Sequence, residues 1–259
     1  MTYETLLVDI RSDYVATITL NRPNQLNTFT TPLAEELTRA LKTLDAAPSV
    51  RVVVIKGAGK HFCAGIDVSE LSGKSPMELR AWIQLMETPL VTISEMDKPV
   101  IAQVHGVAAA NGAGLVAACD LAIAAETARF GLTAINVGLN CVGPVIPVSK
   151  SVGRKTALEM LLYGKLLDAR EALARGLVNR VVPPEELDKA AHDWAAVLAQ
   201  KSPFAVQIAK RSFYTGADME YHKAFAYMNE VFARLCTTED AKEGVKAFLE
   251  KRAPVWKER

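Results

Sequence analysis

Two stretches of small residues, each directly after an apolar segment, are the first candidates for chemistry. The stretch KHFCAGIDVSEL follows RVVVIKGAG, and the stretch VAAANGAGLVAACD follows PVIAQVHG. Small side chains let a ligand approach the backbone closely, and a helix that begins there points its free N–H groups at the ligand. Two such turns can converge on one oxygen atom, which is the requirement of an oxyanion hole.

The glycines in the second stretch also allow other interpretations. Gly112 and Gly114 would permit tight helix packing, and spacing alone favours that interpretation because short glycine motifs are weak signals. The GxG spacing is not a dinucleotide-binding fingerprint, since it lacks the third glycine and the acidic residue about twenty positions later that would hold a ribose. The surrounding elements must therefore decide what these glycines do.

The segments before these turns have the pattern of an α/β fold. RVVVIKG, PVIAQVHG and DLAIAAE are short and almost wholly apolar, as expected for strands buried on both faces of a sheet. TLLVDI and VATITL predict two further strands around a polar turn. Helices are predicted at TPLAEELTRALKTLDAA, with Thr30 or Thr31 as the cap, and over roughly residues 76–96. Strands that alternate with helices imply crossover connections.

After about residue 145 the pattern changes to helical spacing. It recurs in RKTALEMLLYG, AREALARG, EELDKAAHDWAAVLAQ, PFAVQIAKRSFYTG and DAKEGVKAFLEKR, which glycines or prolines separate. The sequence contains no internal repeat and no Gly/Ser linker. We therefore expect a core with the ligand pocket over residues 1–195, and a helical region over residues 196–259 that packs on this core or on a neighbouring subunit.

Composition and charge exclude several classes of protein. The 30 basic residues balance 29 acidic ones, which argues against nucleic acid as a partner because phosphate binding relies on concentrated basic surface. No run of about 18 apolar residues is present to span a membrane. The 4 cysteines form no CxxC pair, so neither a disulfide scaffold nor a metal site is indicated. Together with an N-terminus unlike a signal or transit peptide, these features favour a cytoplasmic protein.

Five stretches of the chain, in order, resemble the crotonase superfamily, the enoyl-CoA hydratase and isomerase family. They are ITLNRPNQLNTFT, VVVIKGAGKHFCAGIDVSEL, KPVIAQVHGVAAANGAGLVAACDLAIAAETARFGL, ALEMLLYGKLLDAREALARGLVNRVVP and EGVKAFLEKRAPVW. The resemblance extends over about the whole chain. It implies an α/β fold, a spiral of ββα units with a helical C-terminal trimerisation region, assembled as a homotrimer or as a hexamer of two trimers.

The resemblance also implies which backbone groups would form the oxyanion hole for an acyl-CoA substrate. The donors would be the N–H groups of Ile66 and Asn111. Asn111 stands where the family generally has a glycine, and a main-chain donor is not removed by that change. A core isoleucine alone would not need the flanking Ala64 and Gly65, which supports the assignment of Ile66.

The family binds coenzyme A in a bent shape, and the resemblance assigns two groups of residues to it. No cofactor is expected beyond this CoA moiety of the substrate. The first group, along the pantetheine and adenine, is Gln25, Leu26, Ala64, Asp67 and Val68. The second group, Phe232, Phe248 and Lys251, would reach the nucleotide from the C-terminal region, often across a subunit boundary. Lys251 by itself also fits a solvated helix charge.

The chain departs from the resemblance where typical hydratases carry two glutamates that hold and activate water. Those positions fall on Gly114 and Ala134, whose side chains cannot transfer a proton. Cys141 and His105 are weaker catalytic candidates, because such a cysteine is more often a small buried hydrophobe and such a histidine more often structural. Residues 72–92, part of the expected acyl-pocket wall, carry no pattern that singles out a residue.

These observations leave two functions open. The first is an enzyme that stabilises the enolate of an acyl-CoA thioester, for isomerisation, hydration by an unusual route, decarboxylation or thioester cleavage. The second is an acyl-CoA binding protein that keeps the pocket without turnover. In either case we expect ordinary hydratase activity to be very slow, because both recognised proton-transfer groups are missing.

Overall fold

Two β-sheets form the body of the molecule. In the computed structural model, which describes residues 2–257, six strands form one sheet in the order β1-β2-β3-β4-β6-β9, and three form another in the order β5-β7-β8. In the larger sheet β1 and β2 are antiparallel and the other neighbours are parallel. The strands are β1 (Leu6–Ile10), β2 (Val15–Leu20), β3 (Val52–Gly57), β4 (Val100–Val104), β5 (Val107–Ala109), β6 (Leu121–Ala125), β7 (Arg129–Gly131), β8 (Leu167–Asp168) and β9 (Arg180–Val182).

Helices bury both faces of the larger sheet. Along β3, Val53 and Ile55 belong to the main core, whereas Val52 and Val54 belong to a second core that includes α7. Burial on both faces explains the continuous apolar runs in the sequence. The helices are α1 (Thr31–Ala46), α2 (Pro76–Glu95), α3 (Asn111–Ala118), α4 (Val145–Val152), α5 (Arg154–Tyr163), α6 (Ala169–Ala174), α7 (Leu187–Ala199), α8 (Pro203–Ala217), α9 (Tyr221–Cys236) and α10 (Glu239–Glu250), with short 3₁₀ helices η1 (Pro23–Gln25), η2 (Val68–Leu71), η3 (Thr133–Val137) and η4 (Pro184–Glu186).

The chain passes between the two sheets in ββα units. β4 lies in the larger sheet, β5 lies in the smaller one, and α3 follows; β6 and β7 repeat the two strand positions. Gly106 makes the turn from β4 to β5 with φ +57°, and a Cβ there would overlap the carbonyl oxygen of Lys60. Only glycine fits this turn without strain. The α/β fold expected from the sequence is confirmed.

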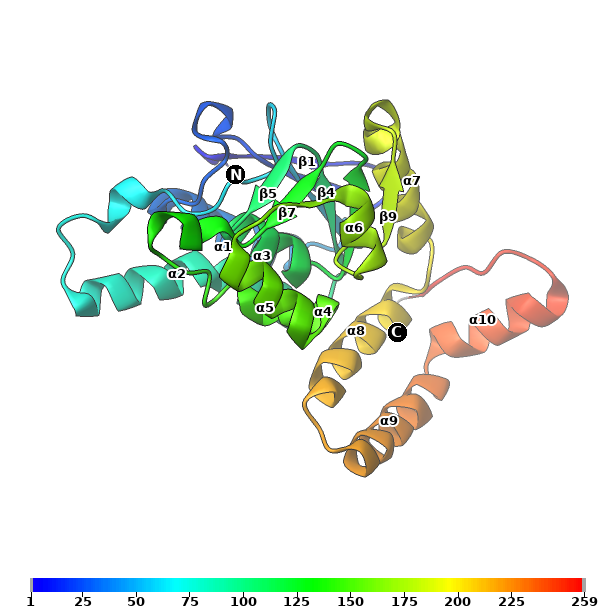
Figure 1. Cartoon of the computed structure of the whole chain (residues 1–259). Coiled ribbons are helices and arrows are strands. Elements are labelled where there is room, and N and C mark those ends of the chain that lie inside the picture. The colour runs from blue at the N-terminus through cyan, green and yellow to red at the C-terminus, as the bar shows by residue number, and fades with distance from the viewer. Residues whose placement is uncertain (1, 258–259) are drawn as a thin grey trace.

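The last three helices project from the body of the molecule (Figure 1). Lys210 of α8 anchors them, because its ammonium lies 2.8 Å from Asp120 Oδ2 and donates to the carbonyl of Lys98 at 2.8 Å. The sequence patterns predicted α8 and α10 but missed α9. The predicted domain boundary at residue 195 falls inside α7, and the division into domains stays a prediction. No helix within residues 2–257 combines the length and hydropathy needed to cross a membrane.

Candidate functional site

The two small-residue turns lie side by side and are joined by backbone hydrogen bonds. We name residues 63–67 the first turn and residues 107–112 the second turn. Ala109 N–H of the second turn donates to the carbonyl of Cys63 in the first turn at 2.9 Å. Gly112 lies so close to the same carbonyl that a Cβ would overlap it. Glycine at position 112 therefore allows the two turns to meet.

The backbone N–H groups of Ile66 and Asn111 donate no hydrogen bond within the described part of the chain, whereas those of several neighbours do. Ala64 N–H donates to Leu26 O at 3.1 Å, and Asp67 N–H donates to Phe29 O at 2.7 Å. Within residues 2–257, neither Ile66 N–H nor Asn111 N–H donates to an acceptor. Asn111 is the first residue of α3, where a helix leaves its N–H groups without intrahelical partners. Each turn thus offers at least one main-chain N–H without an acceptor among the described residues, that of Ile66 in the first turn and that of Asn111 in the second.

Backbone conformation keeps the residues between these donors small. Ala110 has φ 49° and ψ −116°, a region that costs a residue with a Cβ about 1–2 kcal/mol. Gly65 has φ +115°, and a Cβ on it would lie 2.9 Å from Ala110 Cβ and 3.9 Å from Asn111 N. The first and second turns therefore touch at Gly65 and Ala110, between the two free donors.

Both turns line a cavity of about 260 Å³. Its other walls come from η2, α2, η3 and the loop that precedes α4, and most of its side chains are apolar, which is typical of small-molecule sites. Glu87 and Cys141 are its titratable side chains. The lining residues are Ala64, Ile66, Val68, Leu71, Trp82, Ile83, Met86, Glu87, Ala110, Asn111, Thr133, Ala134, Val137, Leu139, Asn140, Cys141, Val142, Gly143 and Pro144.

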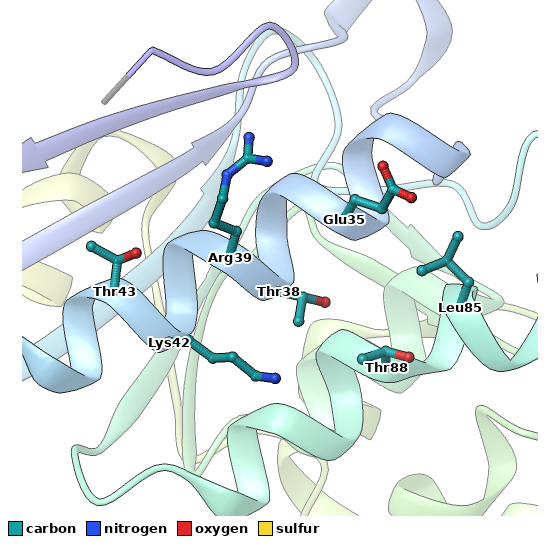
Figure 2. A pocket seen from close by; sticks show the side chains of 7 residues that line it. All are labelled: Glu35, Thr38, Arg39, Lys42, Thr43, Leu85 and Thr88. Atoms are coloured by element: carbon teal, nitrogen blue, oxygen red, sulfur yellow. The ribbon is translucent and has the colours of Figure 1, made fainter.

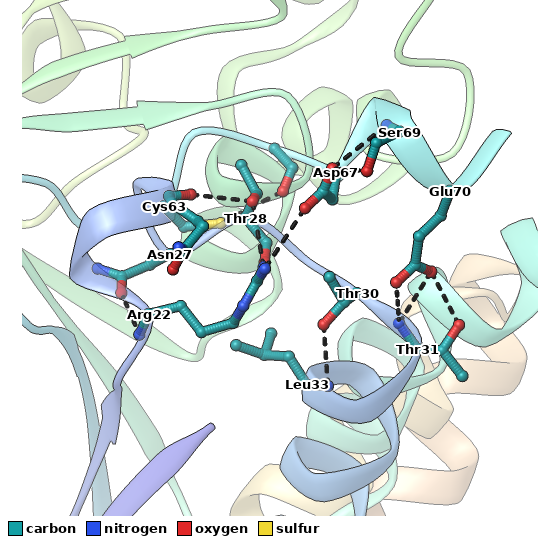
Figure 3. A network of polar contacts seen from close by, with 12 residues as sticks. Arg22, Asn27, Thr28, Thr30, Thr31, Leu33, Cys63, Asp67, Ser69 and Glu70 are labelled. Atoms are coloured by element: carbon teal, nitrogen blue, oxygen red, sulfur yellow. Dashed lines mark hydrogen bonds and ion pairs between the residues drawn. The ribbon is translucent and has the colours of Figure 1, made fainter. Parts of the chain in front are cut away.

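Two acidic residues, one at the end of the first turn and one on η2, are held by several hydrogen-bond donors (Figure 3). Asp67 accepts hydrogen bonds from the backbone N–H and the hydroxyl of Ser69 at 3.2 and 2.6 Å. The hydrogen bond from Ser69 holds the pKa of Asp67 below its ordinary value, and the guanidinium of Arg22, 3.4 Å away, acts in the same direction. Glu70 accepts from Thr31 N–H at 3.1 Å and from Trp82 Nε1 at 2.8 Å. Both carboxylates therefore have structural partners within the chain.

The residues assigned to the pantetheine and adenine gather around the first turn. Leu26 is bonded to Ala64 through its carbonyl, and Gln25, Leu26 and Val68 are exposed. Asp67 caps the 3₁₀ helix η2 that begins at Val68. Their assignment to the pantetheine and adenine stays a prediction.

The C-terminal residues assigned to the nucleotide are not brought to this cavity within the chain. Phe232 lies on α9 with 66% of its surface exposed, and Phe248 lies on α10 with 81% exposed. Lys251 caps the end of α10 with φ 54°.

Cys141 and His105 have different positions. Cys141 lines the cavity, and burial raises the pKa of its thiol despite a hydrogen bond with the backbone of Ala134. His105 Nε2 lies 2.9 Å from Gly59 O, and the ring lines a separate hollow of about 480 Å³. The structure does not bring His105 to the cavity.

The two positions without the expected glutamates also differ. Ala134 lines the cavity, whereas Gly114 lies behind it. A Cβ at Gly114 would lie 2.8 Å from Pro144 Cβ, 3.0 Å from Pro144 Cα and 3.1 Å from Leu90 Cδ2. Pro144 and Leu90 thus fill the space that a side chain at 114 would use, and tight packing is one reason for glycine here.

Sequence reasoning missed Glu87, the carboxylate that lines the cavity. It lies on α2 beside an apolar stripe formed by Trp82, Met86 and Leu90, which recur every fourth residue. Burial raises the pKa of Glu87 above its ordinary value. A lone glutamate beside such a stripe does not mark a site by itself, so the sequence held no signal that singled out Glu87.

A second face of α2 borders a different hollow. This hollow, of about 480 Å³, lies between α1 and α2 and is lined by polar residues of α1 together with Leu85 and Thr88 (Figure 2). Leu85 and Thr88 fall in the range expected for the acyl-pocket wall, but this hollow contains none of the individual residues predicted for the site. The two turns and Glu87 therefore belong to the cavity on the other face of α2.

Comparison with known proteins places these features in a family. The model of the enoyl-CoA hydratase/isomerase family matches residues 11–259. The (E)-benzylidenesuccinyl-CoA hydratase of Thauera aromatica is 36% identical over 249 residues, which are 95% of this chain and 96% of that protein.

Solved structures are similar over the whole chain. The enoyl-CoA hydratase of Mycobacterium smegmatis has a TM-score of 0.95 and 40% identity, with 98% of this chain and 99% of that chain covered. Human enoyl Coenzyme A hydratase domain-containing protein 3 has a TM-score of 0.94 and 31% identity, with 98% and 100% covered. The crotonase-like fold with a helical C-terminal region is thereby confirmed.

Proposed function

The chain belongs to the enoyl-CoA hydratase/isomerase family, and we propose that it binds an acyl-CoA thioester and stabilises the enolate of that thioester. The donors would be the backbone N–H groups of Ile66 and Asn111. The observation that carries the proposal is the meeting of the first and second turns beside the cavity, where the N–H groups of Ile66 and Asn111 have no acceptor within residues 2–257. No cofactor is proposed beyond the CoA moiety of the substrate.

The chemistry follows from where charge develops. When a proton leaves the carbon next to the thioester carbonyl, the negative charge moves to the carbonyl oxygen. Two fixed N–H groups in an apolar cavity stabilise this oxygen without reorganising, and the positive end of the α3 dipole acts in the same direction. The strained Ala110 keeps Asn111 at the start of α3, where its N–H is free.

We propose that CoA lies along the surface of the first turn, against Gln25, Leu26, Ala64, Asp67 and Val68. Because Phe232, Phe248 and Lys251 lie away from the cavity of their own chain, we propose that they contact the nucleotide of a neighbouring subunit. The exposed fractions of Phe232 and Phe248, 66% and 81%, support a role in contacts outside the chain.

We also propose that the protein is a homotrimer or a hexamer. The projecting helices α9 and α10 expose large apolar side chains that a monomer would leave in water, among them Phe225, Phe232, Phe248 and Leu249. Light scattering should give the mass of three or six chains, and the mass of one chain would refute the proposal. A cytoplasmic location is proposed from the cysteine pattern of the sequence.

The rival function is acyl-CoA binding without turnover, which the absence of a carboxylate at Gly114 and Ala134 favours. Calorimetric titration with several acyl-CoA esters, alongside turnover assays on the same esters, separates the two. Binding with turnover supports the enzyme, and binding without turnover across the panel supports the binding protein. No binding to any ester would refute the proposed function itself.

A further inference from the structure

Glu87 is the carboxylate that enters the cavity from α2. Of the residues that line the cavity, only Glu87 and Cys141 are titratable, and burial raises the pKa of the Cys141 thiol. Within residues 2–257, no N–H or O–H group donates a hydrogen bond to the Glu87 carboxylate, and no cation pairs with it. Asp67 and Glu70, by contrast, are held by several donors each. Glu87 therefore differs from the acids that support the first turn.

The loop before α4 makes room for this carboxylate. A Cβ on Gly143 would overlap Oε1 of Glu87, so the carboxylate rests against the bare backbone of the loop. The next residue, Pro144, fills the space beside Gly114. The same two-residue segment thus closes the position of one expected glutamate and opens space for a carboxylate from another helix.

The helix that carries Glu87 is bonded to the second turn and to η2, which follows the first turn. Asn111 of the second turn donates its side-chain amide to the carbonyl of Met86 at 3.4 Å. Trp82, one turn earlier on α2, donates to Glu70 beside the first turn at 2.8 Å. Glu87 therefore has a defined position relative to the proposed oxyanion donors, which a proton-transfer group requires.

We propose that Glu87 is the proton-transfer residue of the site, replacing the carboxylates missing at Gly114 and Ala134. This inference rests on the proposed binding of an acyl-CoA thioester. The C–H bond next to the thioester carbonyl breaks, its electron pair forms the enolate, and its proton goes to the Glu87 carboxylate. The proton then returns to the same carbon, or to the far end of an adjacent double bond, which shifts that double bond. No oxidant, reductant or further reactant is needed.

Proton transfer can be measured directly in D₂O with but-3-enoyl-CoA, whose protons at carbon 2 are acidified by the carbonyl and by the double bond. Mass spectrometry follows deuterium incorporation, and calorimetry measures Kd for the same ester. The wild type should exchange well above the uncatalysed rate. Glu87→Gln should lose about 10²- to 10⁴-fold in exchange, the range for removal of a general base, while its Kd stays nearly unchanged.

Two further variants test whether exchange depends on the position of the Glu87 carboxylate and not only on a glutamate being present on α2. Gly143→Ala keeps Glu87 but displaces the end of its side chain, so exchange should fall at least about tenfold without loss of the folded state. Glu95→Gln removes an exposed glutamate from the end of the same helix and should leave exchange unchanged.

The outcomes distinguish this inference from the proposed function. Exchange by Glu87→Gln at close to the wild-type rate would overturn the role of Glu87. Binding by the wild type with no exchange would overturn it as well, and would favour the binding protein. Failure of the wild type to bind any acyl-CoA would instead refute the proposed function. Thermal melting of each variant confirms that the folded protein is compared.

Discussion

The side-chain amide of Asn111 donates a hydrogen bond to the backbone carbonyl of Met86 at 3.4 Å, which joins the start of α3 to the middle of α2. The amide is buried, with Asn111 only 7% exposed, so it has no solvent to bond to instead. The resemblance places a glycine at this position in most of the family. In this chain the side chain therefore has a structural partner on the helix that carries Glu87, while the backbone N–H stays free.

Asn111→Ala should separate these two roles of the residue. The main-chain N–H remains, so Kd for but-3-enoyl-CoA should change by less than about threefold, equivalent to under 1 kcal/mol. Loss of the side-chain hydrogen bond should lower the free energy of unfolding by about 1 kcal/mol. Titration calorimetry and urea denaturation measure the two effects. A loss of binding far greater than the loss of stability would mean that the side chain itself contacts the ligand.

Gly65→Ala should damage the first turn at the point where it touches the second. Its φ of +115° is unfavourable for alanine, and the new Cβ would lie 2.9 Å from Ala110 Cβ. Displacing the Ile66 donor should reduce deuterium exchange by about 10²- to 10³-fold, as for loss of one oxyanion donor.

Gly73→Ala is the matched control for that variant. Gly73 has φ +78°, but no atom lies within 4 Å of the Cβ position. Gly73→Ala should lower the free energy of unfolding by about 1–2 kcal/mol through backbone strain, and it should retain deuterium exchange at the wild-type rate. Equal exchange losses in the two variants would show that strain, and not the position of Ile66, is responsible.

Restoring glutamates at the two positions where they are missing should have unequal results. Ala134→Glu should fold, because Ala134 lines the cavity. Gly114→Glu should not fold stably, since even the Cβ of Gly114→Ala would crowd Pro144 at 2.8 Å, an overpacking that costs about 1–3 kcal/mol. Melting temperatures should fall in the order Ala134→Glu, Gly114→Ala, Gly114→Glu. A Gly114→Glu protein as stable as the wild type would show that the segment around Pro144 moves.

Much of the fold was predictable because its signals are local. The apolar runs of β3, β4 and β6 and the leucine spacing of α1 reflect burial that each segment shows on its own. α9 was missed although its ends are marked, with Glu220 as its N-cap. Its apolar residues Phe225, Met228, Phe232 and Leu235 recur at spacings of three and four, so the helical signal was present in the sequence and was overlooked.

The site was predictable only where its chemistry lies in the backbone turns. Ile66 and Asn111 lie beside glycines and alanines, and such runs of small residues can be recognised in the sequence alone. Glu87 could not be found in the same way, because its role depends on a cavity formed with Gly143, 56 positions along the chain (143 − 87), and on close packing around Gly114. A single glutamate in an amphipathic helix carries no such information by itself.

The pH dependence of stability tests the environment of Glu87 independently of any reaction. Burial disfavours the charged carboxylate, so the pKa of Glu87 in the folded protein lies above its unfolded value. The wild type should therefore lose stability as the pH rises from the unfolded pKa through the folded pKa, and Glu87→Gln should lack that loss. Asp67, whose pKa is lowered, acts in the opposite sense at lower pH and is common to both proteins, so it cancels from their difference.

Urea denaturation of wild type and Glu87→Gln at a series of pH values measures that difference. The stability of the variant relative to the wild type should increase with pH over this interval and level off above the folded pKa of Glu87. Deuterium exchange by the wild type should rise over the same interval, because a base must be ionised to accept a proton. Stability curves that stay parallel at all pH values would show that the carboxylate is as well solvated in the folded protein as in the unfolded chain. If the stability curves are parallel but deuterium exchange by the wild type still rises with pH, the titrating base is another group in the cavity.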